Sequence, residues 1–261
     1  MYFKILGLSL RSRMSFRSNF FVMLAATFIK EFANLALMLV VVQRFDGLAG
    51  WTAWEIGFIY SIVTFSVRNF WSFFGGVLEI GNLVRTGDMD EYMLTPLNPL
   101  FLINSRNTMV WRAYYNIGIL FLALYCGMRA GIVFGFLGIA SFSVMMISSM
   151  LILFSLNLIV GTLAFFIVEV SAVTQVIEEI VKKYMYYPIN IFGPVMSFVL
   201  TFIVPLGFIA YYPGAYMLGK SREIIFNPVL GILTPIVSLV WTAAALLLWK
   251  HSARSYQSTG T

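Results

Sequence analysis

Long apolar stretches alternate with short polar interruptions along the chain, and six of these stretches are long enough to form helices that cross a membrane. A span needs about 20 apolar residues, because the helix rises about 1.5 Å per residue. The six predicted spans lie at about Phe20–Val42, Ile56–Ile80, Asn107–Cys126, within Gly131–Val168, Ile189–Tyr211 and Val229–Trp249. The fourth window is too long for one span. It holds either a tilted helix that projects beyond the bilayer or a separate outer element before the span.

Polar segments lie at both ends of this pattern. Arg11, Arg13 and Arg17 punctuate residues 1–19, which are predicted to form an amphipathic helix flat on the inner membrane surface. A disordered basic leader is the alternative. Residues 250–261 are predicted to be a polar tail. No segment is long or polar enough for a soluble domain, so residues 1–261 are predicted to form a single transmembrane domain.

Composition supports the same fold class. The chain is 60% hydrophobic and 11% charged, whereas soluble domains carry roughly 25% charged residues. The alternating pattern of an outer-membrane barrel is absent, so an all-α integral membrane bundle is predicted. The single cysteine, Cys126, has no cysteine partner for a disulfide and no neighbours for a metal site.

The net charge of +6 indicates membrane topology rather than nucleic-acid binding. With both termini inside, eleven of the 17 Lys and Arg residues are predicted to lie on the cytoplasmic side: Lys4, Arg11, Arg13, Arg17, Arg85, Arg106, Arg112, Lys182, Lys183, Lys250 and Arg254. Four are predicted to lie outside: Arg44, Arg129, Lys220 and Arg222. This bias predicts a multi-pass protein of the inner (cytoplasmic) membrane.

The most structured polar interruption is Gly75–Leu100, after the second predicted span. Gly87 suits the position just past a helix end, where φ is positive. Asp88 is a good N-cap, and Glu91 stands three residues later as in a capping box. Pro96 ends the new helix after barely two turns. The segment 81–97 is predicted to be either a short rigid cytoplasmic helix or a capped turn lying in the headgroups.

Three charged residues fall within predicted spans, where a charge requires a partner or a cavity. Glu31 and Arg68 each lie about half-way through their helices, so a contact between them is predicted. A structural ion pair is favoured over a substrate contact. Alternatively, the first span is shifted outward, which leaves Lys30 at the inner interface.

Amide side chains within the spans are predicted to form hydrogen bonds between helices. Asn34, Asn69 and Asn157, together with Phe65 and Phe73, form a weaker prediction of a path for an amphipathic substrate. Aromatic stripes are common by chance in a chain with 25 phenylalanines.

The segment Gly214–Ser221 matches the phosphate-binding pattern G-x-x-x-x-G-K-[ST], with Lys220 as its lysine. That pattern binds phosphate only between a strand and a helix of an α/β domain. Here the end of a membrane helix precedes it. The match is therefore rejected, and any ATPase is predicted to be another chain.

Two stretches resemble the ABC-2 type permeases, in particular a six-helix subfamily often found as paired permeases. They are IGNLVRTGDMDEYMLTPLNPL, at Ile80–Leu100, and YYPINIFGPVMSFVLTFIVPLGFIAYYPGAYMLG, at Tyr186–Gly219. The motif residues of the first are Arg85, Gly87, Asp88, Leu94, Pro96 and Leu97. The resemblance covers nearly the whole chain.

The resemblance implies that the short cytoplasmic helix is a coupling helix, which inserts into a groove of the ATPase subunit. Its contact residues would be Arg85, Asp88, Met89, Asp90, Glu91, Tyr92 and Leu94. The acidic residues would pair with basic residues of the groove, while Met89 and Tyr92 would supply apolar contacts. It also implies short re-entrant outer helices at Leu206–Gly219. One kinked helix followed by a loop is the alternative.

The predicted function is thus the membrane permease subunit of an ATP-binding cassette exporter, which is a transport subunit and not an enzyme. The implied partners are ABC ATPase subunits, a second permease (identical or a sister chain) and membrane lipid, with no nucleic acid. ATP and magnesium would bind the partner ATPase, with no cofactor in this chain. The alternative is an ATP-independent secondary transporter or channel, for which Glu31 and Lys30 offer a poor ion site.

Overall fold

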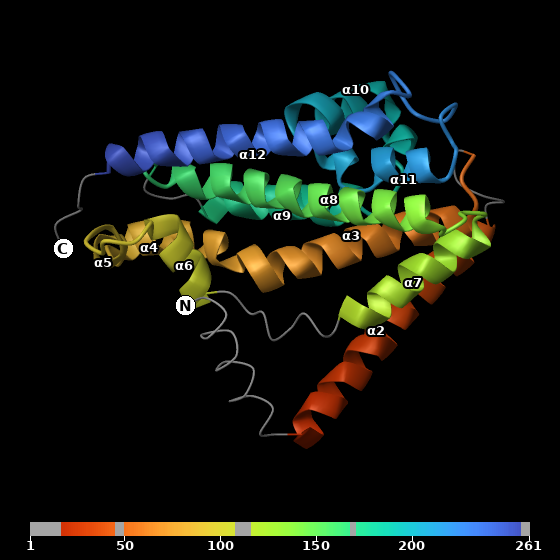
Figure 1. The fold of residues 1–261 in the computed structure, drawn as a ribbon, viewed down its shortest axis with the longest axis horizontal. Coiled ribbons are helices and arrows are strands. Elements are labelled where there is room, and N and C mark those ends of the chain that lie inside the picture. The colour runs from red at the N-terminus through yellow and green to blue at the C-terminus, as the bar shows by residue number, and fades with distance from the viewer. Residues whose placement is uncertain (1–16, 45–49, 108–115, 168–170, 257–261) are drawn as a thin grey trace.

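The structure, a computed structural model, describes residues 17–44, 50–107, 116–167 and 171–256. Every regular element in these ranges is helical (Figure 1), so the predicted all-α class is confirmed for this part of the chain. The amphipathic helix predicted at 1–19 lies outside the described residues except for its last three, which begin α2.

Five long helices form the body of the molecule. They are α2 (Arg17–Arg44), α3 (Ala53–Phe74), α7 (Asn116–Arg129), α8 (Phe136–Leu163) and α12 (Leu230–Arg254). Helix α8 is central because it packs along both α12 and α3 (Figure 1). Helix α3 in turn contacts α7 and α2, which diverge from the rest of the bundle.

The long fourth window contains a single helix. Residues 130–135 form a turn and irregular backbone, and α8 then runs for 28 residues without a break, so the first part of the window contains no separate regular element. The last helix also extends further than predicted, because α12 continues to Arg254 and takes up the first five residues of the predicted tail.

Two helices of the described part combine the length and apolar composition needed to cross a membrane, namely α8 and α12. A bent pair, Ile189–Ile203 and Leu206–Met217, forms a third candidate if it counts as one span. Helix α3 is not apolar enough to join these candidates, because it carries polar residues such as Glu55, Arg68 and Asn69. The structure therefore supports an integral membrane bundle, while the total of six spans stays a prediction.

The second predicted span is not a straight helix. Helix α3 ends at Phe74 and continues as a tighter 3₁₀ turn, η1 (Gly75–Glu79), before α4 (Ile80–Thr86). Two further short helices follow, α5 (Met89–Met93) and α6 (Pro99–Asn107). All three lie together at one end of the molecule (Figure 1).

The fifth predicted span is broken several times. Helix α9 (Ser171–Tyr184) precedes it, followed by η3 (Ile189–Phe192), α10 (Gly193–Phe198), η4 (Val199–Ile203), η5 (Leu206–Phe208) and α11 (Tyr211–Met217). The chain bends by 77° between Ile203 and Leu206. Pro205 stands at this bend and cannot donate a backbone hydrogen bond. Short helices are present in the predicted range Leu206–Gly219, as η5 and α11, but their outer, re-entrant location stays a prediction.

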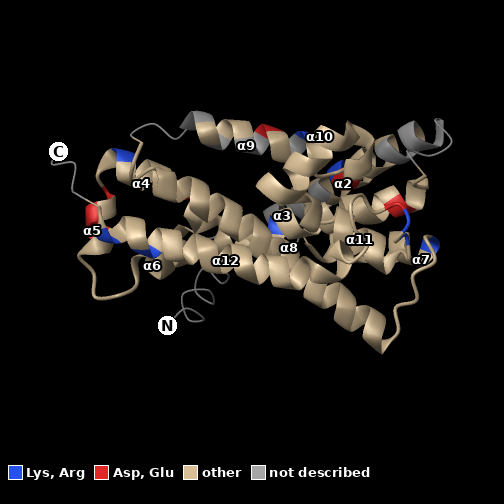
Figure 2. Cartoon of the chain, turned by 90° about the horizontal axis from the view of Figure 1, so that it is seen from above, with Lys and Arg blue, Asp and Glu red and all other residues tan. Residues whose placement is uncertain are grey.

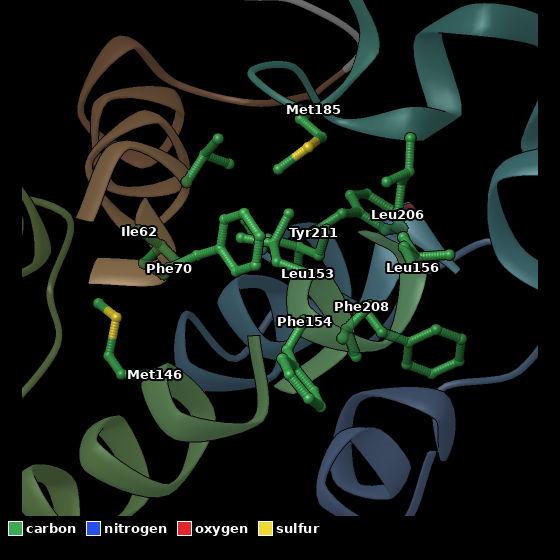
Figure 3. Close-up of a cluster of buried hydrophobic side chains, with 14 of the residues drawn as sticks. Ile62, Phe70, Met146, Leu153, Phe154, Leu156, Met185, Leu206, Phe208 and Tyr211 are labelled. Carbon is green, nitrogen blue, oxygen red and sulfur yellow. The ribbon is translucent and has the colours of Figure 1, made fainter. Parts of the chain in front are cut away.

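Side chains from α3, α8 and the bent segment meet in a buried apolar cluster (Figure 3). Ile62 and Phe70 reach it from α3, Met146 and Leu153 from α8, and Tyr211 from α11. Charged residues gather at the two ends of the molecule, and further charges lie between them on α9 and on α2 and α3 (Figure 2). Helix α8 carries no Asp, Glu, Lys or Arg, and α12 carries none before Lys250, which suits spans that lie in hydrocarbon.

Candidate functional site

The short helix predicted after the second span is present as α5, and a glycine in the left-handed conformation separates it from α4. Gly87 has φ +80° and ends α4, as its position past a helix end requires. The capping box predicted for Asp88 and Glu91 is wrong, since no side-chain cap bond forms. Asp88 has helical backbone angles, whereas a capping side chain needs an extended backbone. Its carboxylate instead accepts a hydrogen bond from the Thr86 hydroxyl at 2.6 Å.

Of the seven residues predicted to contact a partner, some are buried in the structure and others are exposed. Met89 is fully buried and Tyr92 is only 7% exposed, so both pack into the chain's own core. The predicted role of these two as apolar contacts for a partner does not fit this burial. The residues that face outward are Arg85, Asp88, Glu91 and Leu94. Leu94 is 86% exposed and is therefore the apolar group that α5 presents at its end.

Asp90 lies on the inward-facing side of α5 and is half-buried. Its neighbour is Tyr256, just beyond the end of α12. Burial, together with the Asp90 carboxylate, raises the pKa of the Tyr256 phenol to about 12. The Tyr256 ring also packs edge-on against Phe165, which contacts Trp249 of α12. Asp90 therefore faces the last helix of its own chain.

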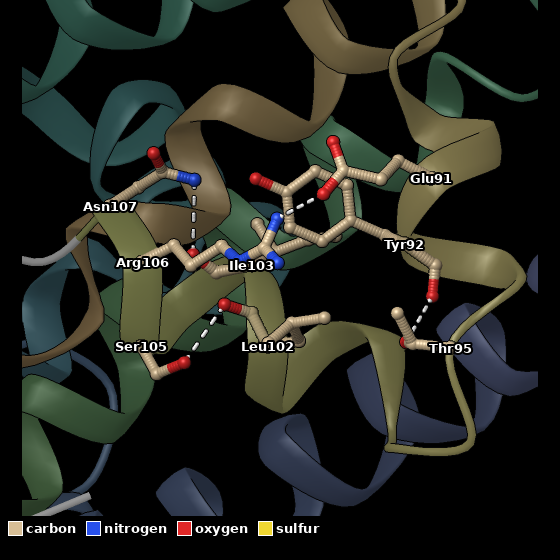
Figure 4. Close-up of polar contacts among 8 residues, drawn as sticks. All are labelled: Glu91, Tyr92, Thr95, Leu102, Ile103, Ser105, Arg106 and Asn107. Atoms are coloured by element: carbon tan, nitrogen blue, oxygen red, sulfur yellow. Dashed lines mark hydrogen bonds and ion pairs between the residues drawn. The ribbon is translucent and has the colours of Figure 1, made fainter.

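Glu91 is held by an arginine for which the sequence predicts only a location on the cytoplasmic side. Arg106 of α6 forms an ion pair with Glu91 at 2.6 Å and stacks over the Tyr92 ring at 5.2 Å (Figure 4). The hydrogen bond of Arg106 to Glu91, and to a smaller extent its hydrogen bond to Tyr92, raises the pKa of Arg106. At the end of α5, the Thr95 hydroxyl donates to the Tyr92 carbonyl at 2.8 Å. The outward surface is therefore firmly connected to α6.

The polar pair predicted inside the bundle is present as a contact. Arg68 of α3 forms an ion pair with Glu31 of α2, and the Tyr60 hydroxyl donates to the second Glu31 oxygen at 3.0 Å. Lys30 is exposed on the neighbouring position of α2. Glu31 also borders an apolar cavity of about 290 Å³ between α2 and α7. With both of its oxygens engaged, Glu31 serves as the bonded centre of a polar cluster.

The structure does not gather the predicted substrate-path residues into one channel. Asn69 and Asn157 each donate to the carbonyl four residues earlier in their own helix, at 2.8 Å, and not to another helix. Asn34 is exposed and Phe65 is half-buried. Phe73 lines a separate cavity of about 500 Å³ with residues of α6 and α8. A substrate path through these five residues stays an untested prediction.

The phosphate-loop match at Gly214–Ser221 has an internal structural role. Gly214 lies inside α11 rather than in a loop, and Lys220 pairs with Glu55 at 3.0 Å. Lys220 also donates to the Gly50 carbonyl and lies 5.0 Å from the centre of the Trp51 ring. Glu55 simultaneously completes a capping box with Thr52 at the start of α3. The lysine therefore connects the segment after α11 to the start of α3.

Lys220→Ala is expected to lower the free energy of unfolding by about 1–3 kcal/mol, because the largely buried Glu55 loses its cation. Thermal unfolding of the full chain in detergent measures this loss. Arg222→Ala is the matched control, since Arg222 is an exposed cation two residues away. Equal stability of the two variants would contradict the proposed connecting role.

Helix α6 and its contacts are the main feature that sequence reasoning missed. A start signal was present, because Asn98 precedes Pro99 and the two suit the N-cap and first helical positions. The Asn98 side chain accepts from the Phe101 amide at 3.3 Å. No comparable local signal indicates which partners Asn104 and Arg106 would meet.

These features define a helical integral membrane protein that has a compact group of short helices at one end and a bent segment toward the other. The chain belongs to the ABC-2 family transporter proteins, since the model of that family matches residues 28–260. It is therefore a permease of ABC-type transport, a class whose members generally work with ABC ATPase partners. No curated protein and no solved structure matches the chain.

Proposed function

We propose that the chain is the membrane subunit of an ATP-driven exporter in the cytoplasmic membrane, powered by separate ATPase subunits that bind α4 and α5. ATP closure of an ATPase dimer would move these helices and so reorient the spans. The permease would work as a pair, with an identical or a sister chain. Both termini would lie in the cytoplasm, on the side of α4–α6.

One observation carries this proposal. The end of the molecule presents a small outward surface of Arg85, Asp88, Glu91 and Leu94, supported from below by the buried Met89 and Tyr92. An exposed leucine that follows exposed charged side chains along the same short segment resembles the mixture of apolar centre and polar rim found at interfaces. Because Met89 and Tyr92 are buried beneath this surface, it is rigid enough to transmit a movement to the rest of the chain.

The alternative, an ATP-independent secondary transporter or channel, needs an ionisable group that is available to an ion within the membrane. Glu31, the candidate for that role, already accepts from both Arg68 and Tyr60. The exporter therefore fits the described residues better.

Charge reversal tests the proposed coupling surface. Asp88→Lys is expected to lower coupled ATP hydrolysis by roughly tenfold, the effect of losing about 1.4 kcal/mol of charge complementarity at an interface. Asp90→Lys is also expected to lower it, partly through its contact with Tyr256. The measurement is ATP hydrolysis by the permease reconstituted with the ATPase chain that co-purifies with it, while membrane insertion is expected to persist.

Glu79→Lys is the matched control, because Glu79 is an exposed acid at the same end but lies on η1. It is expected to retain coupled hydrolysis. If both aspartate variants hydrolyse ATP at the rate of the unaltered complex, the assignment of α5 as the coupling helix is wrong.

A further inference from the structure

Helix α6 contacts two elements that the proposed mechanism must keep together. Near its end, Arg106 reaches Glu91 and Tyr92 of α5, with an ion-pair distance of 2.6 Å. Two residues earlier, Asn104 donates its side-chain amide to the carbonyl of Phe73, at 2.7 Å. Phe73 belongs to the last turn of α3. A single short helix thus connects the end of the second span to the helix that carries the outward surface.

The Asn104 bond is placed where α3 changes its winding. At Gly75 the chain passes from an α-helix to a 3₁₀ turn, and the hydrogen-bond pattern of the backbone shifts with it. Mid-helix 3₁₀ stretches often mark hinges. A side chain from another helix that bonds to a carbonyl at this junction would restrict bending there.

Backbone packing brings α6 directly against the same junction. A Cβ added to Gly76 would lie 2.5 Å from the Asn104 Cα and 2.7 Å from the Ile103 carbonyl oxygen. Ile103 itself is fully buried. Contact this close is possible because position 76 has no side chain. The backbone of α6 therefore packs directly against the junction, and the Asn104 hydrogen bond holds it there.

We propose that α6 is a brace that fixes α5 relative to α3, with Asn104 and Arg106 as its two positioning residues. The inference rests on the proposed function for its consequence: a displacement of α5 would reach the second span through α6 as well as through α4. Glu91, predicted from the sequence to pair with a partner protein, acts in the brace through Arg106.

The distance between α5 and α3 tests the brace without any ATPase. Cysteines are introduced at Leu94 and Trp71, both exposed, and carry spin labels, while the native Cys126 is fully buried. In the full chain in lipid nanodiscs, the labels are expected to give one narrow distance. Asn104→Ala is expected to raise the population of other distances by about fivefold, as the loss of one hydrogen bond predicts.

Asn107→Ala is the matched control, because Asn107 lies on the same helix and, among the described residues, its amide donates to Ile103 of that helix, at 3.1 Å. It is expected to keep the narrow distance. Equal distributions for the Asn104 and Asn107 variants would overturn the brace.

The second arm uses the exposed ion pair, where folding is not at risk. Arg106→Glu is expected to broaden the distance, and adding Glu91→Arg to that variant is expected to narrow it again. If the exchanged pair stays as broad as Arg106→Glu alone, the ion pair has no positioning role and the proposal fails. Coupled hydrolysis tests the proposed function separately: unchanged hydrolysis in both Asp88→Lys and Asp90→Lys would contradict the coupling role of α5, and the distance measurements on the brace would still stand.

Discussion

Replacing Glu31 with alanine is expected to destabilise the folded protein by roughly 3–5 kcal/mol, because Arg68 then keeps a charge inside the bundle with no carboxylate beside it. Glu31 is 8% exposed and accepts from both Arg68 and Tyr60. Arg68→Ala is expected to have an effect of similar size, because it leaves the carboxylate uncompensated. Chemical denaturation of the full chain in detergent micelles measures both variants.

The double variant Glu31→Gln with Arg68→Met tests whether the two charges compensate each other in the folded protein. It removes both charges and keeps similar volumes, so it is expected to be much closer in stability to the unaltered protein than either single variant. Lys30→Ala controls for the loss of a charge at an exposed neighbour. A double variant as unstable as the sum of the two singles would show that the charges do not compensate each other.

Gly76→Ala is expected to cost about 1–3 kcal/mol, since the added methyl group meets backbone atoms of α6 that cannot rotate away. Displacing α6 also shifts Asn104 and Arg106 together, so coupled ATP hydrolysis should fall with stability. The two measurements are thermal unfolding and ATP hydrolysis of the reconstituted complex.

The neighbouring glycine supplies a strict control. A Cβ on Gly75 meets nothing within 4 Å, and its backbone has an ordinary helical φ of −58°. Gly75→Ala is therefore expected to leave stability unchanged or slightly higher. Similar losses at both positions would mean that the turn itself, and not its contact with α6, is sensitive to substitution.

Much of this architecture was predictable because it depends on local patterns. Apolar length located the long helices, and the glycine at position 87 has the positive φ expected of it. Glu31 and Arg68 were paired from depth alone, since two helices of known direction bring mid-span charges to the same level.

The predictions that failed depend on tertiary contacts. Thr52 and Asp88 each precede a glutamate by three residues, yet a capping box forms at Thr52 alone. At Asp88 the backbone is already helical, and Arg106 holds Glu91. Likewise, five residues of helix do not reveal which face is covered, so the sequence alone does not separate Met89 and Tyr92 from the outward-facing residues. Their burial depends on the core beneath α5.

Helix α9 was not predicted either, although its sequence is strongly amphipathic. The sequence predicts only that Lys182 and Lys183 lie on the cytoplasmic side, and they follow Glu178 and Glu179. Glutamates four residues before lysines instead favour a helix through side-chain pairs along one face. The structure places all four on α9.

The bent segment after Ile203 has a consequence for the order in which the protein is built into the membrane. Its interrupted backbone cannot enter hydrocarbon alone, because the carbonyls freed at the bend need other donors. The Ile209 carbonyl accepts from Ser149 of α8, and Thr201 bonds to Tyr212 across the bend at 2.7 Å. Synthesis from the N-terminus delivers α8 before this segment, so its donor is in place when residues 204–210 emerge. Helix α12, synthesised last, then closes over α8 and α11 and completes the bundle.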